Sequence, residues 1–408
     1  MKGTPIRLLH FADLHIGVEN YGQIDRQTGL HRRVLDFLHR LDEVVAYALR
    51  HEADVVLFAG DAFRTRSPEP THQREFAARI RRLSQAGIAV VLLVGNHDVP
   101  AIAQRASSLD IFSALGVPNV TVLNKARRVR LETKHGPLQI VGLPYPIRQR
   151  LLKKQEYRKL TPEQLDDRMT GLMLSTLRRL SAEVEPEVPA VLAGHFSLDQ
   201  AADGSERKIM VGRDLSLPRS EIAAGPWAYV ALGHIHRHQD VNEGRAPGIV
   251  YAGSLERIDF GEEEEAKGFV WVEIAPDETT WRFIEVKARP MLTIEVDVRE
   301  ADAPLALVQR RLARRQVRDA IVRLIIRMRP EQREQLRNKA LTALLKGAFH
   351  AKIIPEVEYP RRDRLAGVEL EAMTPALLLE RYLVASGKPP EVVRAFLEEA
   401  ATIFERPA

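Results

Sequence analysis

Five short segments of the chain carry side chains that commonly bind metal ions, and each directly follows a run of apolar residues. The segments are Asp13-Leu14-His15, Gly60-Asp61, Gly95-Asn96-His97-Asp98, Gly194-His195 and Gly233-His234-Ile235-His236. Carboxylate, imidazole and amide groups together suit divalent metals of intermediate softness, such as manganese, iron or zinc. A single Asp-x-His or Gly-Asp pair is more often an ordinary turn, but five such segments together predict a metal centre.

The elements that must position these side chains are strands. Strand-like runs precede the five segments at residues 7–11, 54–58, 89–94, 190–192 and 228–232. Helical patterns alternate with these runs at residues 34–49, 71–85 and 162–180. In the first of them, apolar residues recur at helical spacing. This alternation predicts a layered α/β fold with parallel strands. The carboxyl ends of such strands form the edge where ligands bind, so we expect the five segments to meet there.

Composition narrows the class of protein without choosing a function. The 408 residues include no cysteine, which excludes disulfides and thiolate metal sites. No run of about 18 apolar residues is present to span a membrane, and the N-terminus leads directly into a strand, so we expect no signal peptide and a cytoplasmic protein. The net charge of +5 permits a polyanionic partner but does not require one.

The pattern starts afresh after residue 287. Strands are predicted at 291–298, 320–328 and 351–357, with helices at 303–316 and 331–345, and this region lacks metal-type segments. Two helices are predicted in the last segment. The first begins at Thr374-Pro375 and ends before the break at 387–390, and the second runs from there to Phe404. We therefore divide the chain at residues 1–287, 288–366 and 367–408.

The ordered set of five segments resembles the calcineurin-like metallophosphoesterases. A further stretch, residues 251–263 (Tyr-Ala-Gly-Ser-Leu-Glu-Arg-Ile-Asp-Phe-Gly-Glu-Glu) followed by Lys267-Gly268-Phe269, is similar to the end of the nuclease domain in SbcD-type DNA repair exonucleases. Those nucleases work with SbcC-type ATPases on double-strand breaks. The resemblance implies a metallophosphoesterase fold of central β-sheets flanked by helices, a small α/β capping domain, and a C-terminal helical hairpin that docks onto an SMC-type ATPase. It also implies that a helix at 101–115 serves homodimerisation.

The resemblance also assigns the ligands of two divalent ions, which we expect to be manganese. One ion would be held by Asp13, His15, Asp61 and His236. The second would be held by Asp61, Asn96, His195 and His234, so that Asp61 bridges the two. Two ions about 3.5–4 Å apart can bind one hydroxide for attack on a phosphodiester and offset the charge that develops on oxygen.

Five further residues are candidates for catalysis or substrate binding. By resemblance, His97 contacts the phosphate and protonates the leaving oxygen, and an imidazole titrates in the suitable pH range. Asp98 either orients His97 or pairs with backbone groups in the turn. The family often has a histidine three residues after the Asp of Gly-Asp, but this chain has Arg64, which can bind a phosphate yet cannot donate a proton at neutral pH. Tyr21 and Arg26 follow the first metal segment and are candidate substrate contacts by position.

The sequence therefore predicts a manganese-dependent DNA exonuclease and endonuclease that acts with an SbcC-like ATPase on DNA ends, structured duplexes or single strands. Two alternatives stay open. A phosphoesterase with the same site could act on a small or non-DNA phosphoester, although the length beyond residue 287 argues against it. A DNA-tethering scaffold with a structural metal site is the other, although the complete ligand set and His97 weigh against it. An arginine cluster in the second unit could track phosphates or form a solvated face: Arg310, Arg311, Arg314, Arg315 and Arg318.

Overall fold

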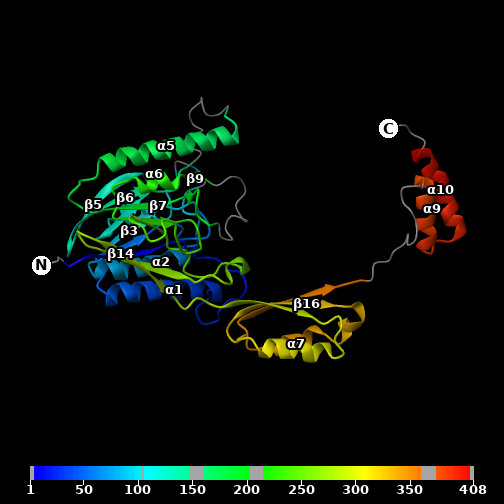
Figure 1. Ribbon diagram of the computed structural model, residues 1–408. Coiled ribbons are helices and arrows are strands. Elements are labelled where there is room, and N and C mark those ends of the chain that lie inside the picture. The colour runs from blue at the N-terminus through cyan, green and yellow to red at the C-terminus, as the bar shows by residue number, and fades with distance from the viewer. Residues whose placement is uncertain are drawn as a thin grey trace.

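The computed structural model describes residues 4–100, 102, 105–147, 160–202, 215–359 and 374–404 of the 408-residue chain. Two six-stranded sheets, their covering helices, a smaller three-stranded unit and a pair of C-terminal helices make up this part of the chain (Figure 1).

The first sheet has the strand order β14-β13-β1-β2-β3-β4. Its strands are β1 (Ile6–Phe11), β2 (Val55–Phe58), β3 (Ala89–Leu93), β4 (Val120–Leu123), β13 (Gly268–Ile274) and β14 (Thr279–Glu285). Strands β1 to β4 are parallel, whereas β13 and β14 join as an antiparallel hairpin beside β1. The parallel strands are almost wholly apolar because both faces of the sheet are covered.

The second sheet has the order β11-β12-β10-β7-β6-β5. Its strands are β5 (Arg127–Thr133), β6 (Gly136–Leu143), β7 (Ala190–His195), β10 (Tyr229–Gly233), β11 (Gln239–Asp240) and β12 (Gly248–Tyr251). The four central strands are parallel and the two edge strands are antiparallel. The two sheets face each other across one apolar core, to which Leu57 and Val91 contribute from the first sheet and Ile140 and Val191 from the second.

Helices cover the outer face of each sheet and complete a four-layer sandwich (Figure 1). Helices α1 (Arg32–Arg50) and α2 (Pro70–Gln85) pack on the first sheet, and α5 (Pro162–Ala182) and α6 (Arg219–Ala223) pack on the second. Helix α5 begins at a capping box, in which Thr161 and Gln164 each satisfy the backbone amide of the other. Two short strands, β8 (Ser197–Leu198) and β9 (Ser216–Leu217), pair beside the second sheet. The predicted layered α/β class is confirmed.

One predicted helix is much shorter than the sequence suggested. The pattern indicated a helix from residue 101 to 115, but among the described residues of this segment the helix α3 covers only Asp110–Ala114. The Asp110 carboxylate accepts the Ser107 backbone amide at 2.8 Å. A carboxylate that accepts the amide three residues before it is typical of a helix start, so this bond places the beginning of the turn near Ser107.

A second unit, residues 291–357, has its own core. The strands β15 (Met291–Asp297), β16 (Ile321–Met328) and β17 (His350–Val357) form a parallel sheet, which α7 (Pro304–Ala313) and α8 (Asn338–Leu344) cover. The predicted helix at 331–345 is divided into the 3-10 helix η4 (Pro330–Glu334) and α8. The Gln332 side chain donates to the Val298 carbonyl at 2.7 Å, which holds the first turn against the end of β15.

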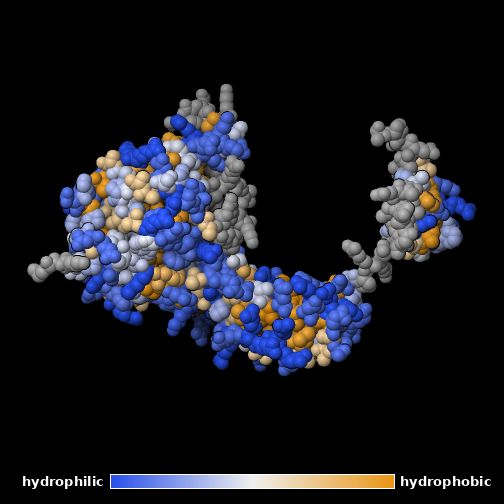
Figure 2. Space-filling view, viewed as in Figure 1, coloured by the Kyte–Doolittle hydropathy of each residue, from blue (hydrophilic) through white to orange (hydrophobic). Residues whose placement is uncertain are grey.

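The C-terminal pair consists of α9 (Pro375–Ala385) and α10 (Pro390–Phe404), which pack against each other. Thr374 caps α9 by accepting the Leu377 amide. Apolar side chains remain exposed on the pair (Figure 2). Val384, at 61%, and Phe396, at 55%, are among them. The division of the chain at residues 287 and 366 stays a prediction, and residue 366 lies outside the described residues. Among the described helices, none has the length and apolar character needed to cross a membrane.

Candidate metal centre

The carboxyl ends of β1, β2, β3, β7 and β10 meet at one edge of the sandwich and bring the five metal-type segments together. Four of the candidate ligands have backbone φ angles in the left-handed region: Asp13 at 50°, His15 at 46°, Asp61 at 64° and His234 at 95°. Non-glycine residues rarely adopt such angles, and clusters of them are typical of functional sites, where packing holds a strained turn in place.

Two glycines permit the close approach of these turns. A Cβ atom on Gly95 would lie 2.1 Å from Asp61 Oδ1, and one on Gly60 would lie 2.4 Å from His195 Nδ1. Gly60 also has a φ of 100°, which other residues adopt only with strain. The two glycines therefore allow Asp61 and His195 to lie beside the backbone of neighbouring strands.

Two groups of ligand atoms lie side by side in the cluster. In one group, His15 Nε2 is 3.1 Å from His236 Nε2, and Asp13 lies close enough to both to share an ion. In the other group, Asn96 Oδ1 lies 2.9 Å from His195 Nε2 and 3.0 Å from His234 Nδ1.

Asp61 stands between the two groups. Its Oδ2 is 3.7 Å from His15 Nε2 and 3.4 Å from His195 Nε2. A carboxylate in this position can offer one oxygen to each of two ions.

Hydrogen bonds on the outer side of the rings determine which nitrogens face the cluster. His195 Nδ1 donates to the Ala59 carbonyl at 2.7 Å, and His236 Nδ1 donates to the Glu262 carboxylate at 2.8 Å. Because carbonyl and carboxylate oxygens can only accept, Nδ1 carries the proton in both rings, and Nε2 points at the other ligands. This arrangement of donors fits a divalent metal ion.

Burial and mutual charge set the ionisation of the cluster. Burial lowers the pKa of His15 well below its ordinary value. Burial also disfavours charge on His195, but the Asp61 carboxylate outweighs it and raises the pKa of His195 to about 9. Burial likewise opposes ionisation of Asp61, yet His195 and the other imidazoles hold the pKa of that carboxyl well below its usual range. An ion bound at His195 Nε2 would take the place of the proton there.

His97 and Asp98 adjoin the cluster, but they bond to different groups. His97 Nδ1 donates to the Arg64 carbonyl at 2.7 Å, and the His97 ring lies edge to face with His15. The buried Asp98 carboxylate accepts the backbone amides of Asp61, Ala62 and Gly95 at 2.8, 3.0 and 3.0 Å. The hydrogen bonds of Asp98 thus hold the two turns together, while the Arg64 carbonyl orients His97.

The three candidate substrate residues lie in different surroundings. The side chain of Arg64 is exposed, and the backbone carbonyl of the same residue contacts His97. Arg26 is exposed on the loop between β1 and α1. Tyr21 packs edge-on against Phe260, with ring centroids 5.3 Å apart, and lies 6.0 Å from the His350 ring of the second unit. Tyr21 therefore lies at the junction between the sandwich and the second unit.

The structure adds two residues that sequence reasoning missed. The ring of Tyr145 lies 5.9 Å from the His234 ring and 6.3 Å from the His195 ring, so it borders the second group of ligands. Glu262 contacts His236 directly. Glu262 belongs to the stretch that carries the family resemblance, but that signal does not reveal which of its acidic residues points inward.

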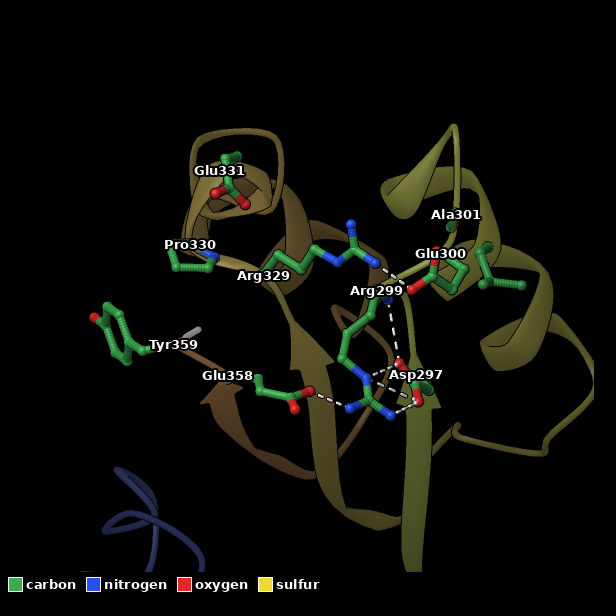
Figure 3. A pocket seen from close by; sticks show the side chains of 10 residues that line it. Asp297, Arg299, Glu300, Ala301, Arg329, Pro330, Glu331, Glu358 and Tyr359 are labelled. Atoms are coloured by element: carbon green, nitrogen blue, oxygen red, sulfur yellow. Dashed lines mark hydrogen bonds and ion pairs between the residues drawn. The ribbon is translucent and has the colours of Figure 1, made fainter. Parts of the chain in front are cut away.

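A pocket of about 1070 Å³ lies in the second unit, away from the metal centre (Figure 3). Both arginines of its lining are paired with carboxylates: Arg299 pairs with Asp297 and Glu358, and Arg329 pairs with Glu300. Among the described residues of this lining, neither arginine is therefore left unpaired to bind an anionic ligand.

Residues 6–238 match the calcineurin-like phosphoesterase family. The chain is 28% identical over 325 residues to the DNA double-strand break repair protein Mre11 of Haloferax volcanii, covering 80% of this chain and 62% of that protein. It is 27% identical over 288 residues to the SbcD component of the SbcCD nuclease of Bacillus subtilis, covering 68% of each. It is 28% identical over 276 residues to the SbcD component of the SbcCD nuclease of Escherichia coli K12, covering 63% of this chain and 62% of that protein. The alignments to the Haloferax and Escherichia proteins thus span less than two-thirds of those relatives.

Proposed function

Since this chain belongs to the calcineurin-like phosphoesterase family, we propose that it is a two-metal nuclease that hydrolyses phosphodiester bonds of DNA. The observation that carries the proposal is the convergence of seven buried or half-buried ligand side chains at the strand ends, with Asp61 between two groups. The names of the relatives, a double-strand break repair protein and a nuclease component, support DNA as the substrate.

In this proposal, one ion is held by Asp13, His15, Asp61 and His236, and the other by Asp61, Asn96, His195 and His234. The mixture of imidazole, amide and carboxylate donors favours Mn²⁺. Two bound divalent ions would activate a water molecule and neutralise charge on the phosphoryl group. The imidazole and amide ligands keep the site from becoming too anionic to admit a phosphodiester.

His97 is the proposed proton donor to the leaving oxygen. The Arg64 carbonyl accepts a hydrogen bond from the Nδ1–H of His97. When the ring is protonated, its Nε2–H is therefore available to donate to the substrate. The ring is half-buried, which leaves it access to solvent for reprotonation. Asp98 takes part indirectly, by fixing the turns that carry Asp61 and His97.

Substrate contacts are proposed for Arg64, Tyr21 and Arg26. The exposed Arg64 guanidinium can hold a phosphate oxygen next to His97. Exposed arginines on and after α7 offer further phosphate contacts, which would make binding depend on salt: Arg310, Arg311, Arg314, Arg315 and Arg318.

Three further parts of the proposal concern assembly. The second unit would cap the nuclease site and help to position DNA. The exposed apolar side chains of α9 and α10 would dock onto an SbcC-like ATPase. Exposed Ile102, Ile111 and Leu115 would contribute to a homodimer interface near α3.

The first experiment is Mn²⁺-dependent degradation of linear duplex DNA by the purified chain, beside Asp61→Ala and with a small phosphodiester as a second substrate. We expect DNA cleavage that chelation abolishes and that Asp61→Ala loses. Cleavage of the small ester alone would favour a different phosphoesterase. If neither substrate is cleaved, even with an SbcC-type ATPase added, the nuclease proposal is wrong and a DNA-tethering scaffold becomes the better explanation.

A further inference from the structure

A short 3-10 helix, η3 (Phe260–Glu262), lies between the metal centre and the second unit. None of the three residues of η3 is a proposed metal ligand. Its residues nevertheless face two ways, because Glu262 contacts the ligand His236 while Phe260 and the following Glu263 contact the second unit.

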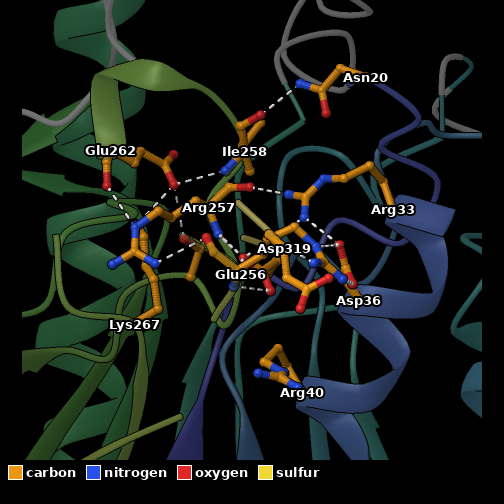
Figure 4. A network of polar contacts seen from close by, with 12 residues as sticks. Asn20, Arg33, Asp36, Arg40, Glu256, Arg257, Ile258, Glu262, Lys267 and Asp319 are labelled. Carbon is orange, nitrogen blue, oxygen red and sulfur yellow. Dashed lines mark hydrogen bonds and ion pairs between the residues drawn. The ribbon is translucent and has the colours of Figure 1, made fainter. Parts of the chain in front are cut away.

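Glu262 contacts the side of the His236 ring that is turned away from the metal centre. The Glu262 side chain is fully buried, and its Oε1 accepts the Nδ1–H of His236 at 2.8 Å. Its Oε2 accepts the Ile258 amide at 3.0 Å and pairs with the buried Lys267 ammonium at 2.9 Å. Lys267 in turn donates to the His236 backbone carbonyl at 3.1 Å. One buried ion pair therefore holds both the ring and the backbone of the same ligand. Figure 4 shows Glu262 of this pair with Ile258, whose backbone amide donates to it.

The second unit anchors η3 on its other side. The Arg323 guanidinium lies over the Phe260 ring, 4.3 Å from its centre. The Glu263 carboxylate accepts the Thr293 backbone amide at 2.7 Å and its hydroxyl at 2.6 Å. Arg323 also donates to the Thr293 hydroxyl at 2.8 Å, so the contacts form one connected group.

We propose that Glu262 is a positioning residue that aims His236 Nε2 at the metal, and that the second unit holds η3 where Glu262 can do so. The inference rests on the metal centre of the proposed function. Its physical basis is that a carboxylate behind a metal-binding histidine fixes the ring and its tautomer and raises its basicity. The geometry agrees, because His236 Nε2 faces His15 Nε2 at 3.1 Å while its Nδ1 faces Glu262.

The test compares Mn²⁺ binding by electron paramagnetic resonance and calorimetry, with thermal unfolding as a check on folding. The main variant combines Glu262→Leu with Lys267→Met, so that neither member of this buried pair is left alone; Glu265, which also pairs with Lys267 at 2.7 Å, is only partly buried. A second variant, Glu262→Gln, keeps an oxygen that can accept a hydrogen bond from His236 Nδ1. Glu264→Gln is the matched control, because Glu264 is an exposed carboxylate two residues along the same segment.

We expect the wild type to bind two ions. The double variant should bind one of them roughly 10- to 100-fold more weakly and the other as the wild type does. Glu262→Gln should lose less affinity, and Glu264→Gln none. A folded double variant that binds both ions with wild-type affinity would overturn the positioning role. If the double variant does not fold, the affinity of Glu262→Gln decides, and an unchanged value overturns the role.

The anchoring part has its own variant, Thr293→Val with Arg323→Leu, which removes the Thr293 hydroxyl bond to Glu263 and the Arg323 contact with Phe260, and leaves the backbone bond of residue 293 to Glu263 in place. We expect the affinity for the same ion to fall several-fold, by less than in the Glu262 double variant. Unchanged affinity would overturn the anchoring and leave the positioning intact. A wild-type chain that binds no Mn²⁺ would instead overturn the proposed metal centre itself, so the two failures are distinguishable.

Discussion

At the scale of single residues, the metal centre combines two kinds of neighbour. Some side chains point a ligand atom into the cluster, and other groups hold those side chains from outside, as the Ala59 backbone carbonyl does for His195 and the Glu262 carboxylate does for His236. Asp98 belongs to the second kind, because its carboxylate bonds three backbone amides of the turns. His97 has its Nδ1 occupied by the Arg64 carbonyl, and the rest of its ring borders the cluster.

His97→Ala should therefore separate catalysis from binding. We expect the single-turnover rate of duplex cleavage to fall roughly 100- to 10,000-fold, which is the usual contribution of a general acid. Mn²⁺ stoichiometry and duplex binding, measured by calorimetry and fluorescence anisotropy, should be unchanged because His97 is outside the proposed ligand set. His39→Ala, on the exposed face of α1, is the control and should cleave normally. A wild-type cleavage rate in His97→Ala would contradict the assigned role.

At the scale of elements, the strand ends determine the site because several turns must share a very small space. The backbone amide of Asp13 donates to the Gly60 carbonyl at 3.0 Å, and the His234 amide donates to the Asp13 carboxylate at 3.0 Å. The turns after β1, β2 and β10 thus support one another directly. A change in one turn should disturb ligands that lie on another.

Gly95→Ala tests this dependence without removing any ligand. The added methyl group would lie 2.1 Å from Asp61 Oδ1 and 2.5 Å from Asp61 N, so Asp61 must move. We expect Mn²⁺ binding to be lost, together with about 1–3 kcal/mol of the free energy of unfolding, as for other overpacked sites.

Gly171→Ala is the control for that change, because a Cβ at this position of α5 meets nothing within 4 Å. Calorimetric Mn²⁺ titration and urea unfolding of the two variants provide the measurement. Normal metal binding by Gly95→Ala would show that the turns can adjust independently.

At the scale of the whole molecule, the two facing sheets bury a histidine whose neutral form the fold requires. Burial, and then the nearby His238, lower the pKa of His10 to about 3 from the ordinary 6.5. The unfolded chain therefore takes up a proton near pH 6.5, whereas the folded chain does so only near pH 3. Stability is complete above pH 6.5 and is lost progressively as the pH falls toward 3.

This titration predicts a steep acid dependence of the unfolding free energy. Between pH 6.5 and 5, wild type should lose about 1.6 kcal/mol through His10, because the slope rises toward roughly 1.4 kcal/mol per pH unit as the unfolded imidazole becomes protonated. His10→Gln should lose correspondingly less, because glutamine does not titrate. Urea unfolding in the presence of chelator at both pH values measures the difference, with the exposed His39→Gln as the control. Equal pH dependence in wild type and His10→Gln would refute the assignment.

The C-terminal pair of helices is the other feature of the whole molecule that calls for a test. Val384 and Phe396 are more than half exposed, and together with Leu377 and Tyr382 they give the pair an apolar surface that a partner could cover. Val384→Asp or Phe396→Asp should weaken binding to an SbcC-type ATPase roughly 10- to 100-fold, since burying each side chain contributes about 1.5–3 kcal/mol.

Duplex cleavage by the isolated chain should be unaffected in both variants, because neither residue belongs to the proposed nuclease site. Glu398→Gln on α10 is the exposed control. Calorimetric titration with the ATPase measures the affinity, and undiminished binding by both aspartate variants would exclude this surface as the docking site.

The sequence by itself determined the class of fold and the chemical identity of the candidate ligands. The fold class follows from the apolar periodicity of each strand and helix, and the ligands follow from the polar residues after each strand. These are local patterns, so they can be identified without knowing which elements contact one another. The late start of α3 and the division between η4 and α8 were not predicted, because the Asp110 carboxylate caps a turn at Ser107 and the backbone of Arg337 is extended, with a ψ of 139°.

Only the tertiary structure decided the partners of those ligands. The Arg64 carbonyl behind His97, the Ala59 carbonyl behind His195 and Glu262 behind His236 lie 33, 136 and 26 residues away along the chain. Such contacts depend on the order of strands in two sheets and on the way the second unit meets η3. No local pattern encodes that order, because it is selected by the packing of the whole chain at once.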